Sequence, residues 1–181
     1  MGHIHIKICI LGPAKVGKST MVSQLLGKPP DESYTPSMGE THTLWLPNQE
    51  GKQLEIEIFD APGYLWNAPC RPELTVNTDG YVVMYADHCQ DTFDQALGLL
   101  EKLKNILGSN SMPIILVANH WSPSQGRKVD EGEKIEKAKR EGVKFKEISA
   151  TNNDQAFNIL KELVSDIGKR KQEGDRDRNV R

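Results

Sequence analysis

Apolar residues along this 181-residue chain gather in six runs of strand length. The runs cover residues 4–11, 42–46, 54–59, 81–85, 114–118 and 143–148. In the first and fifth runs consecutive residues are apolar, as at Ile10 and Leu11 and over residues 115–117. Such runs are typical of strands that are buried on both faces, in a parallel sheet covered by helices.

The third run alternates instead of being apolar throughout. Its apolar residues at 54, 56 and 58 alternate with Glu55 and Glu57, and the turn-forming segment 47–51 separates it from the second run. This pattern predicts a hairpin that places one antiparallel strand at the edge of the sheet.

Helical spacing lies between several of the runs. Apolar residues fall at three- and four-residue steps over 93–107 and 156–167, and a weaker, mostly solvated pattern covers 131–140. We expect a further helix over 18–26. Together these patterns predict an α/β fold: a mostly parallel six-stranded sheet with one antiparallel edge strand and helices on both faces.

The composition fits one domain over residues 1–169. At 37% hydrophobic residues the chain can form one well-packed core, and it is too short for two. Residues 170–181 are charged and lack apolar side chains until Val180. We therefore predict a fraying helix end followed by a disordered tail.

The net charge and the cysteines indicate which partners and which cellular compartment to expect. A net charge of −2 argues against nucleic acid as a partner, because a nucleic-acid-binding protein needs a basic surplus. Cys9, Cys70 and Cys89 are an odd, scattered set without a C-x-x-C pair, as expected in a reducing compartment. No apolar stretch has the length of a membrane span, and no room for a signal peptide precedes the first run. We expect a soluble cytoplasmic protein.

Lipid anchors are also not expected. Ile6 stands where an N-myristoylation motif needs Ser or Thr, and the last residues 179–181 contain no cysteine for prenylation. The sequence therefore predicts no direct membrane anchor.

The segment directly after the first apolar run carries the chemistry. Residues 12–19 read Gly-Pro-Ala-Lys-Val-Gly-Lys-Ser, which matches G-x-x-x-x-G-K-[ST] between a predicted strand and a predicted helix. Backbone N–H groups of such a loop wrap a phosphate, Lys18 supplies a point charge, and the Ser19 hydroxyl can ligate Mg²⁺. The candidate nucleotide-binding residues of this segment are Gly12, Pro13, Ala14, Lys15, Val16, Gly17, Lys18, Ser19 and Thr20.

The remaining loops resemble those of small guanine-nucleotide-binding domains. Residues 34–39, Tyr-Thr-Pro-Ser-Met-Gly, resemble the first switch of Rab-type GTPases, with Ser37 in the place of a Thr that meets Mg²⁺. Asp60-Ala61-Pro62-Gly63 resembles the D-x-x-G motif, in which the carboxylate holds the metal through water and the Gly N–H senses the γ-phosphate. The resemblance thus implies GTP or GDP with Mg²⁺, and Ser19, Ser37 and Asp60 as the metal site.

Two positions predict slow hydrolysis. Tyr64 follows Gly63 where hydrolytic members carry a Gln that orients the attacking water. A phenol on a rigid ring cannot place a water as an amide does. Ala14 stands where the fastest members have Gly, and its methyl group can crowd the phosphoryl group. We assign no catalytic residue and expect at most a very slow GTPase.

The base-reading motifs are altered. Asn119-His120-Trp121-Ser122 resembles N-K-x-D with only the Asn retained, and Ser149-Ala150-Thr151 resembles the S-A-K loop, whose backbone N–H meets the guanine O6. We include Asn119, His120, Ser122, Ser149, Ala150 and Thr151, together with Tyr64, among the candidate nucleotide-binding residues. His120 can equally stack on the base or face solvent, and Tyr64 and Trp121 can equally pack or contact a partner. Guanine selectivity should be weakened.

The pattern of losses resembles one family in particular. The chain resembles the Rab-like small GTPase of the intraflagellar transport train, the Rab-like protein five family. The features that carry this resemblance are the altered base motif, the missing Gln, the switch around Ser37, the segments 71–74 and 79–83, Asp87 after the fourth run and the missing C-terminal Cys. The resemblance implies a nucleotide-binding subunit of the train's B complex, docked on coiled-coil subunits and needed for cilium or flagellum assembly. It places the protein in the cytoplasm, in the cilium or flagellum and at its base.

Two functions of different classes remain. In the first, nucleotide orders the switches at 31–40 and 61–77 as a binding module, with Tyr64, Leu65 and Trp66 presented to a protein partner. Leu65 and Trp66 can alternatively pack beneath the switch. In the second, the protein is a switch that cycles between GTP and GDP with activating and exchange factors in vesicle trafficking. A nucleotide kinase is disfavoured because Arg71, Arg127 and Arg140 are too scattered to form a lid.

Overall fold

The computed structural model describes residues 4–29, 37–48, 51, 53–66, 76–108, 112–120 and 129–179. Its strands are β1 (Ile4–Leu11), β2 (Glu40–Pro47), β3 (Gln53–Asp60), β4 (Gly80–Ala86), β5 (Ile114–Asn119) and β6 (Lys144–Ile148). They form one sheet in the order β2-β3-β1-β4-β5-β6. β2 pairs with β3 antiparallel, whereas the other neighbours are parallel. The predicted sheet with its antiparallel edge strand is confirmed.

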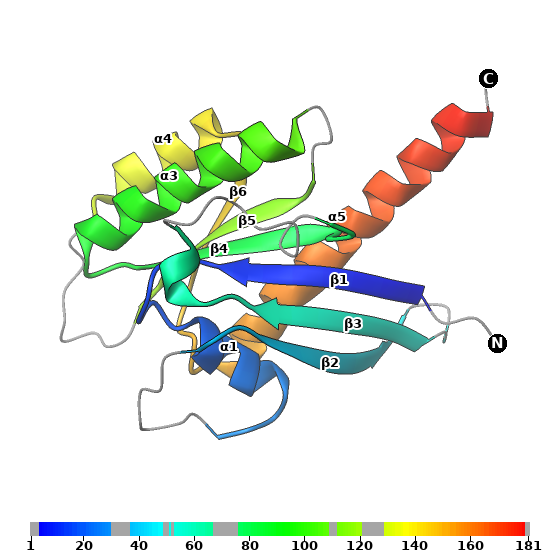
Figure 1. The fold of residues 1–181 in the computed structure, drawn as a ribbon, viewed down its shortest axis with the longest axis horizontal. Helices are drawn as coiled ribbons and strands as arrows, with labels where there is room; N and C mark the ends of the chain where they lie inside the picture. The colour runs from blue at the N-terminus through cyan, green and yellow to red at the C-terminus, as the bar shows by residue number, and fades with distance from the viewer. Residues whose placement is uncertain are drawn as a thin grey trace.

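Helices cover both faces of this sheet (Figure 1). They are α1 (Lys18–Leu25), α3 (Gln90–Leu107), α4 (Glu131–Arg140) and α5 (Asn153–Asn179), and a 3₁₀ turn, η1, covers Gly63–Trp66. α3 and α4 lie side by side over one face, and α1 and α5 lie against the other (Figure 1). This arrangement lets β5 be buried along its whole length, as its continuous apolar run predicts, and β4 is buried in the same way.

The alternation of side chains along β1 divides the core into two layers. Ile8 and Ile10 pack in the cluster that α1 and α5 cover, whereas Cys9 and Leu11 pack in the cluster beneath α3. All four are at most 3% exposed. Because β1 lies in the middle of the sheet, the loop that follows Leu11 is held from both sides.

The strand ends extend beyond the apolar runs where backbone pairing continues. Glu40 pairs with Asp60 in the register of β2 and β3, although neither side chain is apolar. At β6 the opposite holds: the Val143 N–H donates to the carbonyl of Ala138, so the strand begins at Lys144. Hydrophobicity alone does not report these backbone hydrogen bonds.

The last helix differs from the expectation. α5 continues to Asn179, whereas the sequence predicts a fraying end and a disordered tail from residue 170. Lys171 Nζ lies 2.7 Å from Asp79 Oδ1, and Asp79 Oδ2 accepts a 2.9 Å hydrogen bond from the Lys7 N–H. This contact ties Lys171 to the loop before β4 by charge, which the hydrophobic pattern does not show. Among the described helices none has the length and apolarity needed to cross a membrane.

Candidate functional site

The loop between β1 and α1 needs glycine at two positions. Gly12 has φ 146° and Gly17 has φ 97°, which are backbone conformations that L side chains rarely adopt. A Cβ on Gly12 would collide with the backbone carbonyl of Met84, and one on Gly17 would collide with the side-chain amide of Asn119. Both glycines therefore let the loop lie close against the ends of β4 and β5.

Lys18 begins α1 and is buried beneath this loop. Its side chain is 6% exposed, and its Nζ donates a 2.8 Å hydrogen bond to the carbonyl of Pro13. Burial lowers the pKa of Lys18 to about 8, and the negative charge of Asp60 partly opposes that shift. A buried ammonium with one carbonyl partner is well suited to an anionic ligand, because a phosphate would compensate the cost of desolvation.

Ser19 and Asp60 meet beside Lys18. The Ser19 hydroxyl donates a 2.6 Å hydrogen bond to Asp60 Oδ2, which brings the start of α1 to the end of β3. Asp60 is 3% exposed, and its Oδ1 has no hydrogen-bond partner among the described residues. Burial raises the pKa of this carboxyl, while the Ser19 hydrogen bond opposes the shift. A buried carboxylate oxygen without a partner, next to a hydroxyl, is a donor set that fits Mg²⁺.

Ser37 lies near the same carboxylate residue. Its Oγ is 3.5 Å from the backbone carbonyl oxygen of Asp60 and accepts a 3.2 Å hydrogen bond from the Gly39 N–H. The three residues that the sequence proposes as metal ligands, Ser19, Ser37 and Asp60, are thus gathered in one place.

Gly63 approaches the phosphate loop closely. A Cβ built on Gly63 would lie 2.5 Å from Ala14 Cα and 2.6 Å from the Ala14 nitrogen, so only glycine fits. The next residue, Tyr64, is 53% exposed. The side chains of Leu65 and Trp66 lie outside the described part of the chain.

Asn119 uses both ends of its amide to join two loops. Its Nδ2 donates a 3.0 Å hydrogen bond to the Val16 carbonyl, and its Oδ1 accepts a 2.8 Å hydrogen bond from the Ala150 N–H. The side chain is 2% exposed. In this arrangement the Ala150 N–H, the donor that the resemblance assigns to the guanine O6, is bonded to Asn119.

The other candidate residues lie around these groups. Thr20 is in the first turn of α1, and the hydroxyls of Ser149 and Thr151 are 2.8 Å apart in the loop before α5. The Ser149 N–H donates to Gln155 Oε1 at 2.6 Å. Trp121 and Ser122 lie outside the described residues, so their proposed roles stay predictions.

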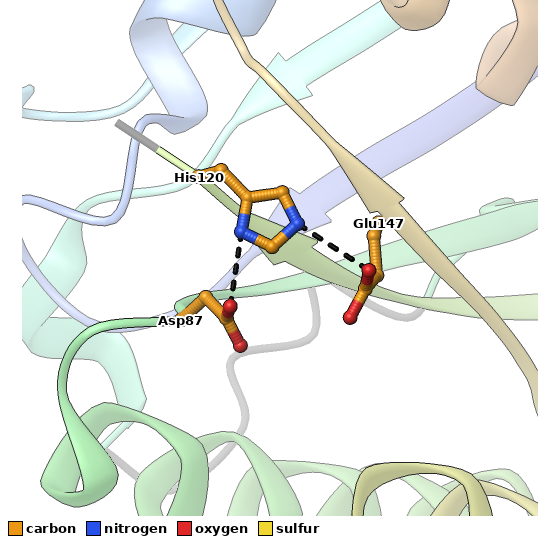
Figure 2. A group of neighbouring side chains, drawn as sticks. All are labelled: Asp87, His120 and Glu147. Carbon is orange, nitrogen blue, oxygen red and sulfur yellow. Dashed lines mark ion pairs between the residues drawn. The ribbon is translucent and has the colours of Figure 1, made fainter. Parts of the chain in front are cut away.

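The His120 side chain lies between two carboxylates. Its Nδ1 lies 2.9 Å from Asp87 Oδ2 and its Nε2 lies 3.5 Å from Glu147 Oε2, as Figure 2 shows. Lys134 of α4 contacts the same two carboxylates. The sequence analysis missed this cluster. The sequence feature that could have predicted it is the position of these residues at strand ends. Asp87 follows β4, His120 follows β5 and Glu147 lies near the end of β6, so parallel pairing brings all three to one edge of the sheet.

Comparison with known proteins shows the family to which this chain belongs. The model of the Ras family matches residues 7–169. The chain belongs to the Ras family. It is similar to the GTP-binding protein Rheb homolog of Dictyostelium discoideum, with 26% identity over 91% of this chain and 89% of the relative. It is also similar to Ras-like protein family member 11A of Homo sapiens, with 26% identity over 91% of this chain and 71% of that protein.

Ras-family GTPases bind GTP or GDP together with Mg²⁺, and this Ras-family domain is a small GTPase with a nucleotide-binding loop. The groups described above fit both ligands. Lys18 and the loop over residues 12–17 would hold the phosphates, and Ser19, Ser37 and Asp60 would hold the metal ion. When bound, the ion would neutralise phosphate charge.

Proposed function

We propose that this Ras-family domain is a guanine-nucleotide-binding module in which bound nucleotide stabilises a surface for a protein partner, with very little hydrolysis. The side chains suited to bind phosphate and metal, namely Lys18, Ser19 and Asp60, lie close together. The name of one relative, a GTP-binding protein, supports guanine nucleotide as the ligand.

The observation that carries this proposal is the position of Tyr64. It directly follows Gly63, which lies close against the phosphate loop at Ala14, and the residue is 53% exposed. A phenol in that place lacks the amide that would orient a water molecule for attack on the γ-phosphate. An exposed aromatic side chain beside the nucleotide is instead suited to anchor a partner.

We further propose that the partner is the coiled-coil pair of the intraflagellar transport B complex, and that the protein acts in the cytoplasm and in the cilium or flagellum and at its base. This part rests on the sequence resemblance, namely the switch around Ser37, the Tyr64 substitution and the altered motif at 119–122. Docking through protein contacts would make a lipid anchor unnecessary.

A cycling switch is the alternative. The retained set of Lys18, Ser19 and Asp60 favours it, because that set is what a GTP/GDP cycle in vesicle trafficking would need. An activating protein could supply an Arg in trans and restore much of the rate. Such a cycle needs activating and exchange factors, so added catalytic partners distinguish the two proposals.

Capture of a purified coiled-coil pair of train subunits by the nucleotide-loaded domain tests the proposal. The double variant Tyr64→Ala with Trp66→Ala should weaken capture while the melting temperature stays unchanged. Ile135→Ala is the matched control, because Ile135 on α4 is 52% exposed and lies on another element.

Equal capture by the wild type and the double variant, at equal melting temperature, would refute an interface on this switch. Absence of any capture by the loaded wild type would refute the intraflagellar partner and leave the nucleotide site untouched.

A further inference from the structure

The described parts of the two switch segments meet beside the candidate metal site. Residues 37–40 lead into β2 and residues 61–63 follow β3, with Glu40 paired to Asp60 in the antiparallel register. The motifs give roles to Ser37, Asp60 and Gly63. They give none to the residues through which the two segments touch.

Gly39 of the first switch lies against two rings. A Cβ built on Gly39 would lie 3.2 Å from Phe59 Cζ and 3.2 Å from both Cγ and Cδ of Pro62. The φ of Gly39 is 97°, a backbone conformation that L side chains rarely adopt. The first switch therefore approaches Pro62 with its backbone, so closely that a side chain on residue 39 would have to displace a ring.

A second glycine shows that a positive φ does not by itself bring such a contact. Gly51, in the turn between β2 and β3, has φ 74°. Beyond its neighbours in the chain, no atom of the described residues lies within 4 Å of a Cβ built on Gly51. The packing of Gly39 on Pro62 is thus a feature separate from its turn conformation.

Pro62 is held firmly because the residues on both sides of it are anchored. The Ala61 N–H donates a 3.1 Å hydrogen bond to the Ile10 carbonyl of β1, and Ala61 is 1% exposed. Gly63 lies against the backbone of Ala14 in the phosphate loop. Pro62 is itself buried, and its ring fixes its own φ. The ring is therefore a rigid support for the first switch.

Gly39 in turn places the hydroxyl of Ser37. The Gly39 N–H donates a 3.2 Å hydrogen bond to Ser37 Oγ, which lies 3.5 Å from the carbonyl oxygen of Asp60. Met38 between them is 77% exposed, so its side chain adds little packing. The position of the Ser37 hydroxyl thus depends on the backbone of Gly39.

We propose that Pro62 is a positioning residue of the nucleotide site, which supports Gly39 and thereby holds the Ser37 hydroxyl beside Asp60 as a ligand for nucleotide-bound Mg²⁺. Direct packing of residue 62 on residue 39 then links the second switch to the first. The inference rests on the proposed nucleotide-binding function, but the support of Ser37 by Pro62 is testable without nucleotide.

Amide hydrogen exchange in the nucleotide-free protein tests that support. Pro62→Ala removes the Cγ and Cδ atoms that lie against Gly39 and leaves only an amide hydrogen in their place. The Gly39 N–H should exchange about three- to tenfold faster, since a contact worth one hydrogen bond shifts a local opening equilibrium by about that factor. The Gly51 N–H, which donates to the Asn48 carbonyl, should exchange at an unchanged rate.

Release of a fluorescent, non-hydrolysable GTP analogue in the presence of Mg²⁺ tests the role in nucleotide binding. Pro62→Ala should release the analogue about three- to tenfold faster than the wild type. Ser37→Ala should also release it faster, and adding Pro62→Ala to Ser37→Ala should change the rate little, because both act through one hydroxyl. With EDTA in place of Mg²⁺, the wild type and Pro62→Ala should release it equally fast.

Gly39→Ala disturbs the same contact from the other side. Its methyl group would meet the rings of Phe59 and Pro62, so release should again be faster. Gly51→Ala is the matched control, because it carries the strain of a positive φ without the contact. It should release the analogue like the wild type, and its melting temperature should fall less than that of Gly39→Ala.

Equal exchange of the Gly39 N–H in the wild type and Pro62→Ala would overturn the inference. Exchange that is faster at Gly51 as well would also overturn it, because Pro62 would then only stabilise the fold. Effects of Pro62→Ala and Ser37→Ala on release that add in full would show that Pro62 does not act through Ser37. A wild type that holds no nucleotide refutes the proposed function instead, and the exchange of the Gly39 N–H then still decides whether Pro62 supports the first switch.

Discussion

The hydroxyl of Ser19 donates a 2.6 Å hydrogen bond to Asp60 Oδ2 across 41 positions of sequence. This one contact joins the first turn of α1 to the end of β3 and leaves Asp60 Oδ1 without a hydrogen-bond partner in the described part of the chain. The two groups that a phosphate-bound metal ion needs are thus already in contact.

Lys18→Ala should weaken GDP binding by about 10- to 100-fold, because a hydrogen bond between charged groups contributes about that much to affinity. Ser19→Asn should weaken it in the presence of Mg²⁺ because the hydroxyl next to Asp60 is lost. The nucleotide-bound protein should melt at a lower temperature in both variants, since a ligand that binds only the folded state stabilises it. Titration and thermal melting measure these effects.

Lys28→Ala, at an exposed position after α1, is the matched control and should leave both quantities unchanged. In the nucleotide-free protein Lys18→Ala should not be destabilising, because it removes a buried charge. Unchanged nucleotide affinity in both Lys18→Ala and Ser19→Asn would contradict the assignment of the phosphate loop.

Nucleotide affinity should fall as pH rises above about 8. Burial lowers the pKa of Lys18 to about 8 in the free protein, and a bound phosphate would raise it, so binding takes up a proton above that pH. The expected slope is up to about tenfold in affinity per pH unit. Titrations from pH 7 to 9.5 measure it.

The stability of the nucleotide-free protein should change in the opposite direction. The folded pKa of Lys18 is below its ordinary value of 10.5, so the unfolded chain binds more protons between pH 8 and that value, and stability rises with pH through Lys18. Lys18→Met should lack both trends. A wild-type affinity that is flat above pH 8 would mean that Lys18 does not meet the phosphate.

Gly63→Ala should displace the segment after β3 from the phosphate loop and speed nucleotide release. The atoms nearest to an added Cβ are Ala14 Cα and Ala14 N, which are backbone atoms that cannot turn aside. The double variant Gly63→Ala with Ala14→Gly should therefore remain impaired, although the methyl group of Ala14 is gone. Full recovery in the double variant would show that side-chain crowding alone limits this contact.

Guanine should be preferred over adenine by less than about 10⁴-fold, below the discrimination of a site with a dedicated hydrogen-bonding residue. The Ala150 N–H is bonded to Asn119, and Ser122 stands where the family motif has a carboxylate. Ser122→Asp should increase the preference. Competition titrations with GTP and ATP that show no change would mean that residue 122 does not face the base.

The periodic pattern predicted the sheet and most of the helices because burial on one or both faces leaves a direct trace in the sequence. It did not predict that α5 continues to Asn179, because residues 170–179 carry no apolar side chains that could show a helical period. The phosphate loop was readable because Gly12 and Gly17 must be glycine for steric reasons.

The surroundings of His120 were not readable in the same way. A motif comparison offers His120 only the nucleotide base or solvent, whereas its neighbours Asp87 and Glu147 come from other strands and meet it through the register of the sheet. The hydrogen bonds of Asn119 to Val16 and Ala150 could not be predicted either. They depend on where two loops lie in the fold, which the spacing of motifs along the sequence does not determine.

Single-turnover hydrolysis of preloaded GTP is the most direct test of a nucleotide-binding module with little turnover. The account predicts a rate at or below about 10⁻⁴ per second in the wild type, the low end for unassisted small GTPases, and a modest increase in Tyr64→Gln. A wild-type rate well above that value, or one that Tyr64→Gln lowers, would contradict it.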